Sequence, residues 1–489
     1  MNAVSREEIE QVEKELDAVL EMVQRPVTVK NADNREEAAS LQENLQESSQ
    51  EKSQKNLQER SQESELVQIE IKKEKKKAGS LGKAKEQTAA AREEKVDAVH
   101  KADADEREDV QAPEEFKDEP ENESEPGNGG FRFLRPGDGM IAAFFVPVAV
   151  LIILFAQRGI FPFGEECFLR TDMYHQYAPF FSEFQYKLKQ GGSLLYSWDI
   201  GMGVNFSALY AYYLASPVNW LIILCPKKFI IEFMTILIMV KTGLCGVTFT
   251  WYLDHHFEKK HFVAGVFGIF YALSGYMAAY SWNIMWLDCI FLLPLILYGL
   301  EQLVQEKKGL FYCVTLGLSI LSNYYISIMI CIFMVMYVIV QVILYPPKKI
   351  KDLVATGVRF GFYSLLAGGL AAVVLLPEIY ALQATASGDF DFPKTISCYF
   401  SIFDMIARHI GNVGTEIGLD HWPNIYCGVA VLMFLLLYLG AKKITVREKA
   451  VYCGLLLMFY ASFSINVLNF IWHGFHYPNS LPCRQSFIY

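Results

Sequence analysis

The chain alternates between two kinds of sequence, a polar N-terminal part and an apolar remainder. Residues 1–130 are rich in charged side chains, whereas from Met140 onward long runs of Leu, Ile, Phe, Val and Tyr are separated by short polar loops. Such runs predict transmembrane helices, because about 20 apolar residues are needed to cross a bilayer as an α-helix. The pattern therefore predicts an all-α, polytopic transmembrane helix bundle over residues 131–489, preceded by a polar tail.

The tail contains one short segment with helical periodicity. Apolar residues within 5–24 follow the spacing of an amphipathic helix, at Ile9, Val12, Leu16, Val19 and Val23. This spacing predicts a short helix that could pair with a protein partner. Residues 44–51 recur in similar form at 56–63, followed by Lys-rich and then Glu/Pro/Gly-rich sequence. Such low-complexity sequence cannot offset its chain entropy by burial, so the tail is predicted to be unfolded or transiently helical.

The apolar runs also predict the membrane spans and their orientation. Arg132 and Arg135 precede the first run, Met140–Ala156. Basic residues mark the cytoplasmic end of a span, so the N-terminus is predicted to be cytoplasmic and residues 158–205 to form an outer loop. Further spans are predicted at Ile231–Tyr252, Phe262–Tyr280, Cys289–Leu303, Leu310–Ser322, Ile326–Leu344, Thr356–Leu376, Ile425–Leu439 and Val451–Val467.

The segment Phe206–Cys225 decides the topology. It is long enough to span, yet it contains three tyrosines, an Asn and a Ser-Pro pair. If it crossed, every later basic loop would lie outside. If it is re-entrant or lies at the interface, the basic clusters at 259–260, 307–308, 348–351 and 442–449 become cytoplasmic, as the positive-inside rule requires. We therefore predict that this segment does not cross.

Composition changes this picture only slightly. Hydrophobic residues make up 52% of the chain, and the acidic tail supplies most of the formal net charge of −10, so that charge does not indicate a ligand. The ten cysteines lie mainly in or beside apolar runs without C-x-x-C pairs. No signal peptide opens the chain, so the first span is expected to be an uncleaved signal-anchor. No nucleotide-binding or nucleophile-elbow motif is present, and no nucleic-acid partner is expected.

The outer loop carries the densest group of chemically active side chains. Asp172 and His175 are three residues apart, so on a helix they would share a face. A carboxylate at the membrane surface can act as a general base towards an acceptor hydroxyl. The alternative is a structural carboxylate that pairs with Arg170 or Lys187. Tyr174, Gln176 and Tyr177 complete the group.

Aromatic and amide side chains collect in the other outer connections. Trp198 and the tyrosines near residue 212 would stack on sugar rings or anchor the protein at the lipid interface. A polar side chain at the end of a span, such as Asp288, is either solvated or turned into a cavity, and for Asp288 a cavity is favoured. His473 and His476 could bind a metal with Asp172, but no other cluster has ligand spacing. No cofactor is therefore identified, and a divalent metal has little support.

Six separated motifs together resemble the YfhO family of bacterial membrane proteins. They are Asp172–Tyr177, Gly191–Trp198, Tyr212–Pro217, Ser281–Asp288, Ser322–Tyr325 and Gly474–Pro482. The resemblance covers residues 139–489 and excludes the tail. Family members usually continue past the last motif with further spans and an outer domain, so the chain is expected to be the front part of a longer protein.

The resemblance implies a GT-C-like glycosyltransferase in the bacterial cytoplasmic membrane. Such enzymes take a sugar from a polyprenyl-phosphate carrier and pass it to an acceptor outside the membrane, here a cell-envelope polymer such as teichoic acid. The resemblance implies Asp172 as the catalytic carboxylate, with His175 beside it and Arg170 or His175 near the carrier phosphate. The expected substrate-binding set is Arg170, Tyr174, Gln176, Tyr177, Trp198, Asn205, Tyr212, Tyr213, Trp282, Asn283, Asp288, Asn323, Tyr324, His476 and Tyr477.

Other functions remain open at this point. A transporter or flippase of a lipid-linked saccharide needs the same cavity but no base. Transporters of this kind usually contain internal repeats and interrupted helices, and no motif occurs twice here. An inactive fragment of a longer YfhO-type protein is a further alternative, as is a non-catalytic scaffold that uses the N-terminal helix.

Overall fold

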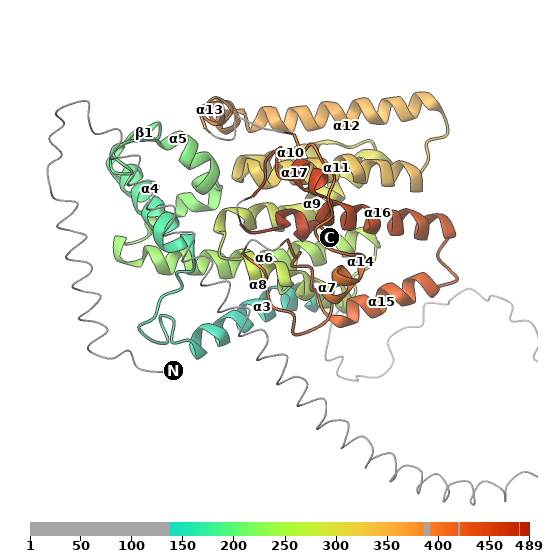
Figure 1. The fold of residues 1–489 in the computed structure, drawn as a ribbon, viewed down its shortest axis with the longest axis horizontal. Coiled ribbons are helices and arrows are strands. Elements are labelled where there is room, and N and C mark those ends of the chain that lie inside the picture. The colour runs from blue at the N-terminus through green and yellow to red at the C-terminus, as the bar shows by residue number, and fades with distance from the viewer. Residues whose placement is uncertain (1–136, 386–391, 419–420, 479) are drawn as a thin grey trace, which may run out of the picture. The chain divides into compact units, whose positions relative to one another are not determined.

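The computed structural model describes residues 137–385, 392–418, 421–478 and 480–489 (Figure 1). The predicted tail, its helix at 5–24 and the boundary near residue 130 lie outside these residues. The described chain is a helix bundle, to which one two-residue antiparallel hairpin is added, β1 (Tyr196–Ser197) with β2 (Val204–Asn205). The all-α fold class is confirmed.

The α-helices follow one another with short connections. They are α3 (Asp138–Gln157), α4 (Ala178–Gln190), α5 (Phe206–Leu209), α6 (Ile230–His256), α7 (Phe262–Ala272), α8 (Gly275–Tyr280), α9 (Ile284–Gln305), α10 (Leu310–Ser322), α11 (Tyr324–Leu344), α12 (Ile350–Leu370), α13 (Ala372–Gln383), α14 (Ile402–Ala407), α15 (Val429–Gly440), α16 (Val446–Ser464) and α17 (Asn466–Trp472). Shorter π- and 3₁₀-helical turns are η1 (Met173–Tyr177), η2 (Tyr210–Leu214), η3 (Pro217–Leu224), η4 (Lys227–Phe229) and η5 (Arg484–Ile488).

Six helical segments among the described residues are long and apolar enough to cross a membrane. They are Asp138–Gln157, Lys227–His256, Phe262–Tyr280, Ile284–Gln305, Tyr324–Leu344 and Ile350–Leu370. Each overlaps a span predicted from the hydrophobic pattern. The bundle is therefore that of a multi-pass membrane protein.

Three predicted spans form helices that do not belong to the six apolar segments. Helix α10 has 13 residues and α15 has 12, fewer than the roughly 20 that a crossing requires. Helix α16 begins at Val446 among charged side chains, and it does not belong to the six apolar segments. Runs of apolar residues thus predicted the presence of these helices, but length and composition do not qualify them as membrane spans.

Helix boundaries also correct two predicted elements. The predicted span Thr356–Leu376 is divided, because α12 ends at Leu370 and α13 begins at Ala372. Helix α9 begins at Ile284, so Asp288 lies inside a span rather than in an outer connection. A carboxylate can occupy this position because Lys241 Nζ of α6 lies 2.5 Å from it.

Helix α9 forms the centre of the bundle. Of its most apolar window, 78% is buried, compared with 22% for α3 and 11% for α12. Its inner end carries Glu301, whose Oε1 accepts hydrogen bonds from Tyr252 of α6 (2.8 Å) and Tyr337 of α11 (2.7 Å). Hydrogen bonds between helices stabilise bundles in lipid, because lipid tails are as apolar as the side chains and the hydrophobic effect does not drive helices together there. Polar contacts therefore join α6, α9 and α11.

The two ends of the bundle differ in character. Helices α4 and α5 and the β-hairpin stand at one end, whereas the start of α12 and the α15–α16 connection lie at the opposite end (Figure 1). The connections at that opposite end contain the basic clusters at 348–351 and 442–449. This segregation agrees with the orientation that the positive-inside rule predicts.

The segment Phe206–Cys225 is sharply bent. Its two helical parts, 206–214 and 217–224, are bent by 102° relative to each other. At its start, the Phe206 ring lies 5.1 Å from Lys187 Nζ of α4. At its end, the Cys225 carbonyl accepts a hydrogen bond from Gln185 Nε2 of α4 (2.8 Å). Both ends thus contact the same helix, α4. A bend of this kind occurs in a broken span and in a re-entrant element, and the prediction that the segment does not cross stays a prediction. The segment is called the re-entrant element below according to that prediction.

We expect single cysteines introduced at Lys227 and Lys259 to react with a membrane-impermeant thiol reagent from opposite sides. Helix α6 separates these positions, and a re-entrant Phe206–Cys225 places Lys227 outside. The measurement compares labelling in intact cells with labelling in inside-out vesicles, against the parent protein with its native cysteines. A third cysteine at Lys307 should follow Lys259. Cytoplasmic labelling at Lys227 would contradict the topology.

Candidate functional site

A sharp turn of the outer loop positions Asp172. The preceding residue, Thr171, has a φ of 47°, a left-handed conformation that is unusual for a β-branched residue. Asp172 then opens the π-helical turn η1, a type of turn found frequently at functional sites. Asp172 is half-buried, whereas Tyr174 and His175 are exposed and pack against each other edge to face (5.2 Å).

Four tyrosines from three separate segments form a cluster near Asp172. This tyrosine cluster consists of Tyr177 of η1, Tyr212 and Tyr213 of η2 and Tyr325 of α11. Ring centroids lie 5.6 Å apart for Tyr177 and Tyr213, 4.7 Å for Tyr212 and Tyr213, and 6.0 Å for Tyr212 and Tyr325. Burial raises the pKa of Tyr177, and the negative charge of Asp172 adds to this effect. Asp172 is the N-cap residue of the same η1 turn that contributes Tyr177 to the cluster.

Amide and indole side chains hold the tyrosine cluster in place. The Tyr177 hydroxyl donates to Asn283 Oδ1 (2.9 Å), and the Tyr213 hydroxyl donates to Gln176 Oε1 (2.8 Å). The Trp282 ring stacks on Tyr177 with centroids 6.2 Å apart. The structure thus brings together seven residues of the predicted substrate-binding set: Gln176, Tyr177, Tyr212, Tyr213, Trp282, Asn283 and Asn323, whose Nδ2 donates to the Tyr212 carbonyl (2.9 Å).

Two more predicted residues border the tyrosine cluster. The Tyr324 ring lies 6.0 Å from Tyr212, and its hydroxyl donates to Glu378 Oε1 of α13 (2.6 Å). The His476 ring lies 5.7 Å from Tyr325. Motifs from the first outer loop, the re-entrant element and the C-terminal segment therefore meet at one place.

Three predicted residues make only local contacts. Trp198 is 76% exposed and packs against Tyr196 of the hairpin (4.8 Å). The Asn205 side chain accepts a hydrogen bond from the Ala208 amide and so caps α5. Tyr477 packs against Phe470 of α17 (5.2 Å). Among the described residues, none of these contacts joins Trp198, Asn205 or Tyr477 to the tyrosine cluster.

Asp288 is occupied by structural contacts. Its Oδ2 pairs with Lys241 Nζ at 2.5 Å, and its Oδ1 accepts from Ser216 Oγ (2.8 Å). Both charged side chains are 1% exposed. Ser216 lies at the bend of the re-entrant element. The ion pair therefore fastens that element to α6 and α9.

Asp172 has no ion-pair partner in the part of the chain that the structure describes. Lys187, one partner considered above, instead pairs with Glu183 (3.3 Å) and donates to the Tyr196 carbonyl (2.9 Å). Arg170, the other, lines a cavity. The carboxylate of Asp172 is consequently available for chemistry.

The cavity beside helix α3, called the α3 cavity below, has a volume of about 510 Å³. Arg158 and Arg170 stand on its lining, and neither guanidinium forms an ion pair or side-chain hydrogen bond within the described ranges. Its remaining walls are mostly apolar and come from α3, α6, α7 and α8, including Val150, Leu151, Leu154, Phe155, Ile238 and Met277. Two cations above apolar walls suit an anionic head group with an apolar chain.

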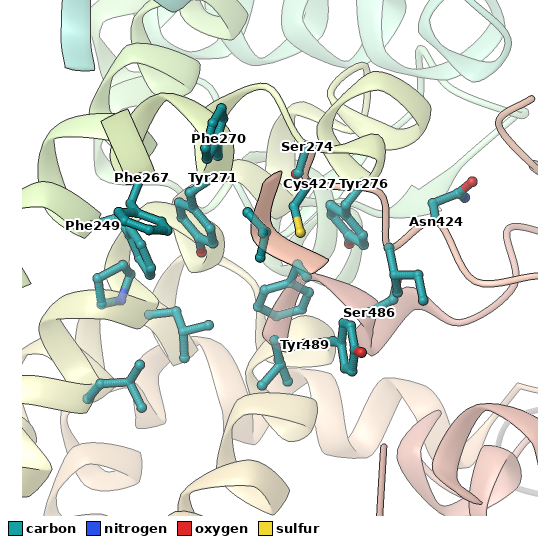
Figure 2. Close-up of a pocket in the computed structure, with 17 residues that line it drawn as sticks. Phe249, Phe267, Phe270, Tyr271, Ser274, Tyr276, Asn424, Cys427, Ser486 and Tyr489 are labelled. Atoms are coloured by element: carbon teal, nitrogen blue, oxygen red, sulfur yellow. The ribbon is translucent and has the colours of Figure 1, made fainter. Parts of the chain in front are cut away.

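A second pocket lies between α7, α8, α9 and the C-terminal segment (Figure 2). It has a volume of about 200 Å³, and none of the predicted site residues lines it. The Tyr276 hydroxyl and the Ser486 Oγ are buried on its lining without a hydrogen-bond partner among the described residues. This pocket is therefore separate from the predicted chemistry.

Arg484 belongs to the site although it was absent from the predicted set. Its guanidinium lies over the rings of Trp286 (5.6 Å) and Tyr325 (5.3 Å), and Nη1 donates to the Tyr325 hydroxyl (3.0 Å). The sequence does contain a signal, because Arg484 is the only Lys, Arg, Asp or Glu between Lys449 and Tyr489.

Among the described residues, no group of three or more His, Cys, Asp and Glu side chains could hold a metal ion. His473 instead makes a structural contact, with Nδ1 2.7 Å from the Asn469 carbonyl. Burial, assisted by the positive charge of Arg484, lowers the pKa of His473 to about 3. His473 is thus a neutral, buried side chain.

We expect His473 to make the folded protein sensitive to acid. An unfolded histidine has a pKa of about 6.5, so the neutral folded form contributes stability above this pH that is lost as the pH falls below it. The test is the thermal midpoint in detergent at pH 7.5 and 5.0. His473→Gln should reduce the drop, whereas the exposed His175→Gln should not. An unchanged drop in His473→Gln would contradict this assignment.

Comparison with known proteins gives one match. A family model described as bacterial membrane protein YfhO matches residues 142–489. No curated protein and no solved structure matches the chain. The match covers most of the chain and includes all of the outer-face motifs, and its membrane character agrees with the six apolar helical segments. The chain belongs to the YfhO family of bacterial membrane proteins.

Proposed function

We propose that the protein is a glycosyltransferase that moves a sugar from a polyprenyl-phosphate carrier to a cell-envelope polymer on the outer side of the bacterial cytoplasmic membrane, with its N-terminus in the cytoplasm. One observation carries this proposal. The half-buried Asp172 has no ion-pair partner in the described chain. It follows Arg170, which lines a cavity suited to an anionic lipid, by two residues, and it precedes the η1 turn, which contributes Tyr177 to a cluster of aromatic and amide side chains suited to a sugar.

The α3 cavity would hold the carrier. Its apolar walls match a polyprenyl chain, and its contact surface extends from Val150 to Arg158 along the outer half of α3. Arg158 and Arg170 would bind the phosphate, because a guanidinium presents forked N–H donors to phosphate oxygens. Arg170 precedes Asp172 by two residues, so the phosphate would be bound close to this carboxylate along the chain.

The tyrosine cluster would hold the sugar and the acceptor hydroxyl. Aromatic faces such as Trp282 stack on the apolar faces of sugar rings, and amides such as Asn283 and Gln176 exchange hydrogen bonds with hydroxyls. In the reaction, Asp172 would take the proton of the acceptor hydroxyl while the oxygen of that hydroxyl forms a bond to the anomeric carbon of the sugar. The bond from that carbon to the carrier oxygen breaks, and the electron pair leaves with the carrier phosphate.

The test is transfer of a labelled sugar in proteoliposomes. The protein receives a polyprenyl-phosphate sugar and a teichoic-acid-type polymer, and label in the polymer is measured over time. The alternative function, transport of the lipid-linked saccharide, predicts movement of the carrier across the bilayer without transfer. Transport does not need the unpaired carboxylate of Asp172, which is why transfer is favoured. Carrier movement with no labelled polymer would contradict the proposal.

A further inference from the structure

Arg484 is a half-buried cation whose contacts are all with neutral groups. Its Nε donates to the Leu481 carbonyl (3.2 Å), Nη1 to the Tyr325 hydroxyl (3.0 Å) and Nη2 to the Ser480 carbonyl (3.1 Å). No carboxylate lies within ion-pair distance of it in the described part of the chain. A desolvated charge is unfavourable unless it is compensated, so the site is electrostatically incomplete.

Two buried lysines in this bundle differ from Arg484, because each forms an ion pair with a carboxylate. Lys241 is paired with Asp288 at 2.5 Å, and Lys187 is paired with Glu183 at 3.3 Å. The Trp286 and Tyr325 rings stabilise Arg484 in part, because aromatic faces attract cations. Unlike a carboxylate, however, these rings do not neutralise its charge. An anion from outside the chain would do so.

Arg484 has the geometry to receive such an anion. A guanidinium has five N–H donors, and the contacts given above use three of them. Its side chain is held by two rings and two carbonyls, so little rotational freedom remains to be lost on binding. Arg484 is half-buried rather than sealed, so a ligand can reach it. A planar, fixed fork of donors matches two oxygens of one phosphate group.

We propose that Arg484 anchors a phosphate ester of the acceptor polymer. Arg484 adjoins the tyrosine cluster, because Nη1 donates to the Tyr325 hydroxyl (3.0 Å) and the Tyr325 ring lies 6.0 Å from that of Tyr212. Asp172 precedes the η1 turn that contributes Tyr177 to the same cluster. A polymer whose phosphate is bound at Arg484 would present a neighbouring hydroxyl towards Asp172. This inference rests on the proposed function and specifies its acceptor as a phosphate-bearing polymer, while the carrier phosphate occupies the α3 cavity.

The test is binding of a short poly(glycerol phosphate) oligomer to the full chain in nanodiscs of uncharged lipid, measured by calorimetry. Arg484→Gln is expected to weaken binding by roughly 10- to 100-fold, because charged hydrogen bonds are lost. Arg484→Lys keeps the charge without the fork and should weaken binding less. The matched control is Arg408→Gln, since Arg408 also donates to outer-face groups, the Pro423 carbonyl and Asn424 Oδ1, and its loss should leave affinity unchanged.

A second arm uses nanodiscs that contain a polyprenyl phosphate and no oligomer. If Arg484→Gln weakens binding of this lipid and not of the oligomer, the acceptor assignment is overturned. Equal binding of the oligomer by the parent and Arg484→Gln also overturns it. If Arg484→Gln does not fold, Arg484→Lys decides by the same comparison. Because neither arm requires transfer, failure of the glycosyltransferase assay would be distinguishable from failure of this inference.

Discussion

Replacement of Asp172 by asparagine is expected to lower sugar transfer by roughly 10²-fold or more. Asparagine keeps the size of the side chain and much of its hydrogen bonding, but it cannot accept the proton of the acceptor hydroxyl. Carrier binding should change little, because the carrier phosphate is assigned to Arg158 and Arg170 in the α3 cavity. The measurement is initial transfer rate in proteoliposomes, with protein level and carrier affinity determined in parallel.

The matched control is Asp199→Asn, an exposed carboxylate of the same outer loop. It tests whether any loss of charge on this loop reduces transfer. His175→Gln is measured in parallel, because His175 is exposed whereas Asp172 is half-buried. A structural carboxylate in an exposed pair would contribute only about 0–1 kcal/mol, and its loss would leave turnover near the parent value. Near-normal transfer by a well-expressed Asp172→Asn protein would remove Asp172 from the mechanism.

Replacement of Lys241 by methionine is expected to destabilise the bundle by about 3–5 kcal/mol, because it leaves a buried carboxylate without its counter-charge. Lys241 and Asp288 are both 1% exposed, and the Lys241 ammonium also donates to the Ile284 carbonyl (3.2 Å). Loss of the pair should loosen the contact between α6, α9 and Ser216 of the re-entrant element. The measurement is reversible unfolding of the purified protein in mixed micelles, together with its level in the membrane.

The double variant Lys241→Met with Asp288→Leu separates the pair from its individual charges. Removing both charges should recover most of the stability lost by the single variant, because no unpaired ion remains. Lys308→Met is the control, since Lys308 pairs with Glu306 at 2.7 Å on the protein surface, where such pairs contribute little. If Lys241→Met is as stable as Lys308→Met, the ion pair does not hold the re-entrant element.

The sequence by itself determined the class of fold and the multi-pass membrane character of the chain. Apolar runs near the length of a membrane crossing are a local property of the chain, so six of them correspond to the apolar helical segments of the structure. The distribution of basic loops is also a local property of the chain. It distinguishes the end of the bundle that carries the clusters at 348–351 and 442–449 from the opposite end. The motifs at Asp172–Tyr177, Tyr212–Pro217 and Ser322–Tyr325 were predicted to lie on one face before their contacts were known, and their tyrosines do contact one another.

The sequence determined less about where helices end and why. Asp288 was placed in an outer connection because a carboxylate lowers local hydropathy. Its partner Lys241 is 47 residues away along the chain, and this pairing compensates the charge of Asp288 inside the apolar helix α9. A hydropathy pattern does not contain such a pairing, because it depends on how α6 and α9 pack.

Only the tertiary structure decided which side chains form the site. It joined Tyr177 to Asn283 and Asn323 to Tyr212, while it left Trp198 and Asn205 with local contacts. It also placed Arg484 beside Tyr325, which lies 159 residues earlier. The physical reason is that burial, charge pairing and ring contacts depend on neighbours brought together by helix packing, whereas the tendency of a segment to enter the membrane depends mainly on its own residues.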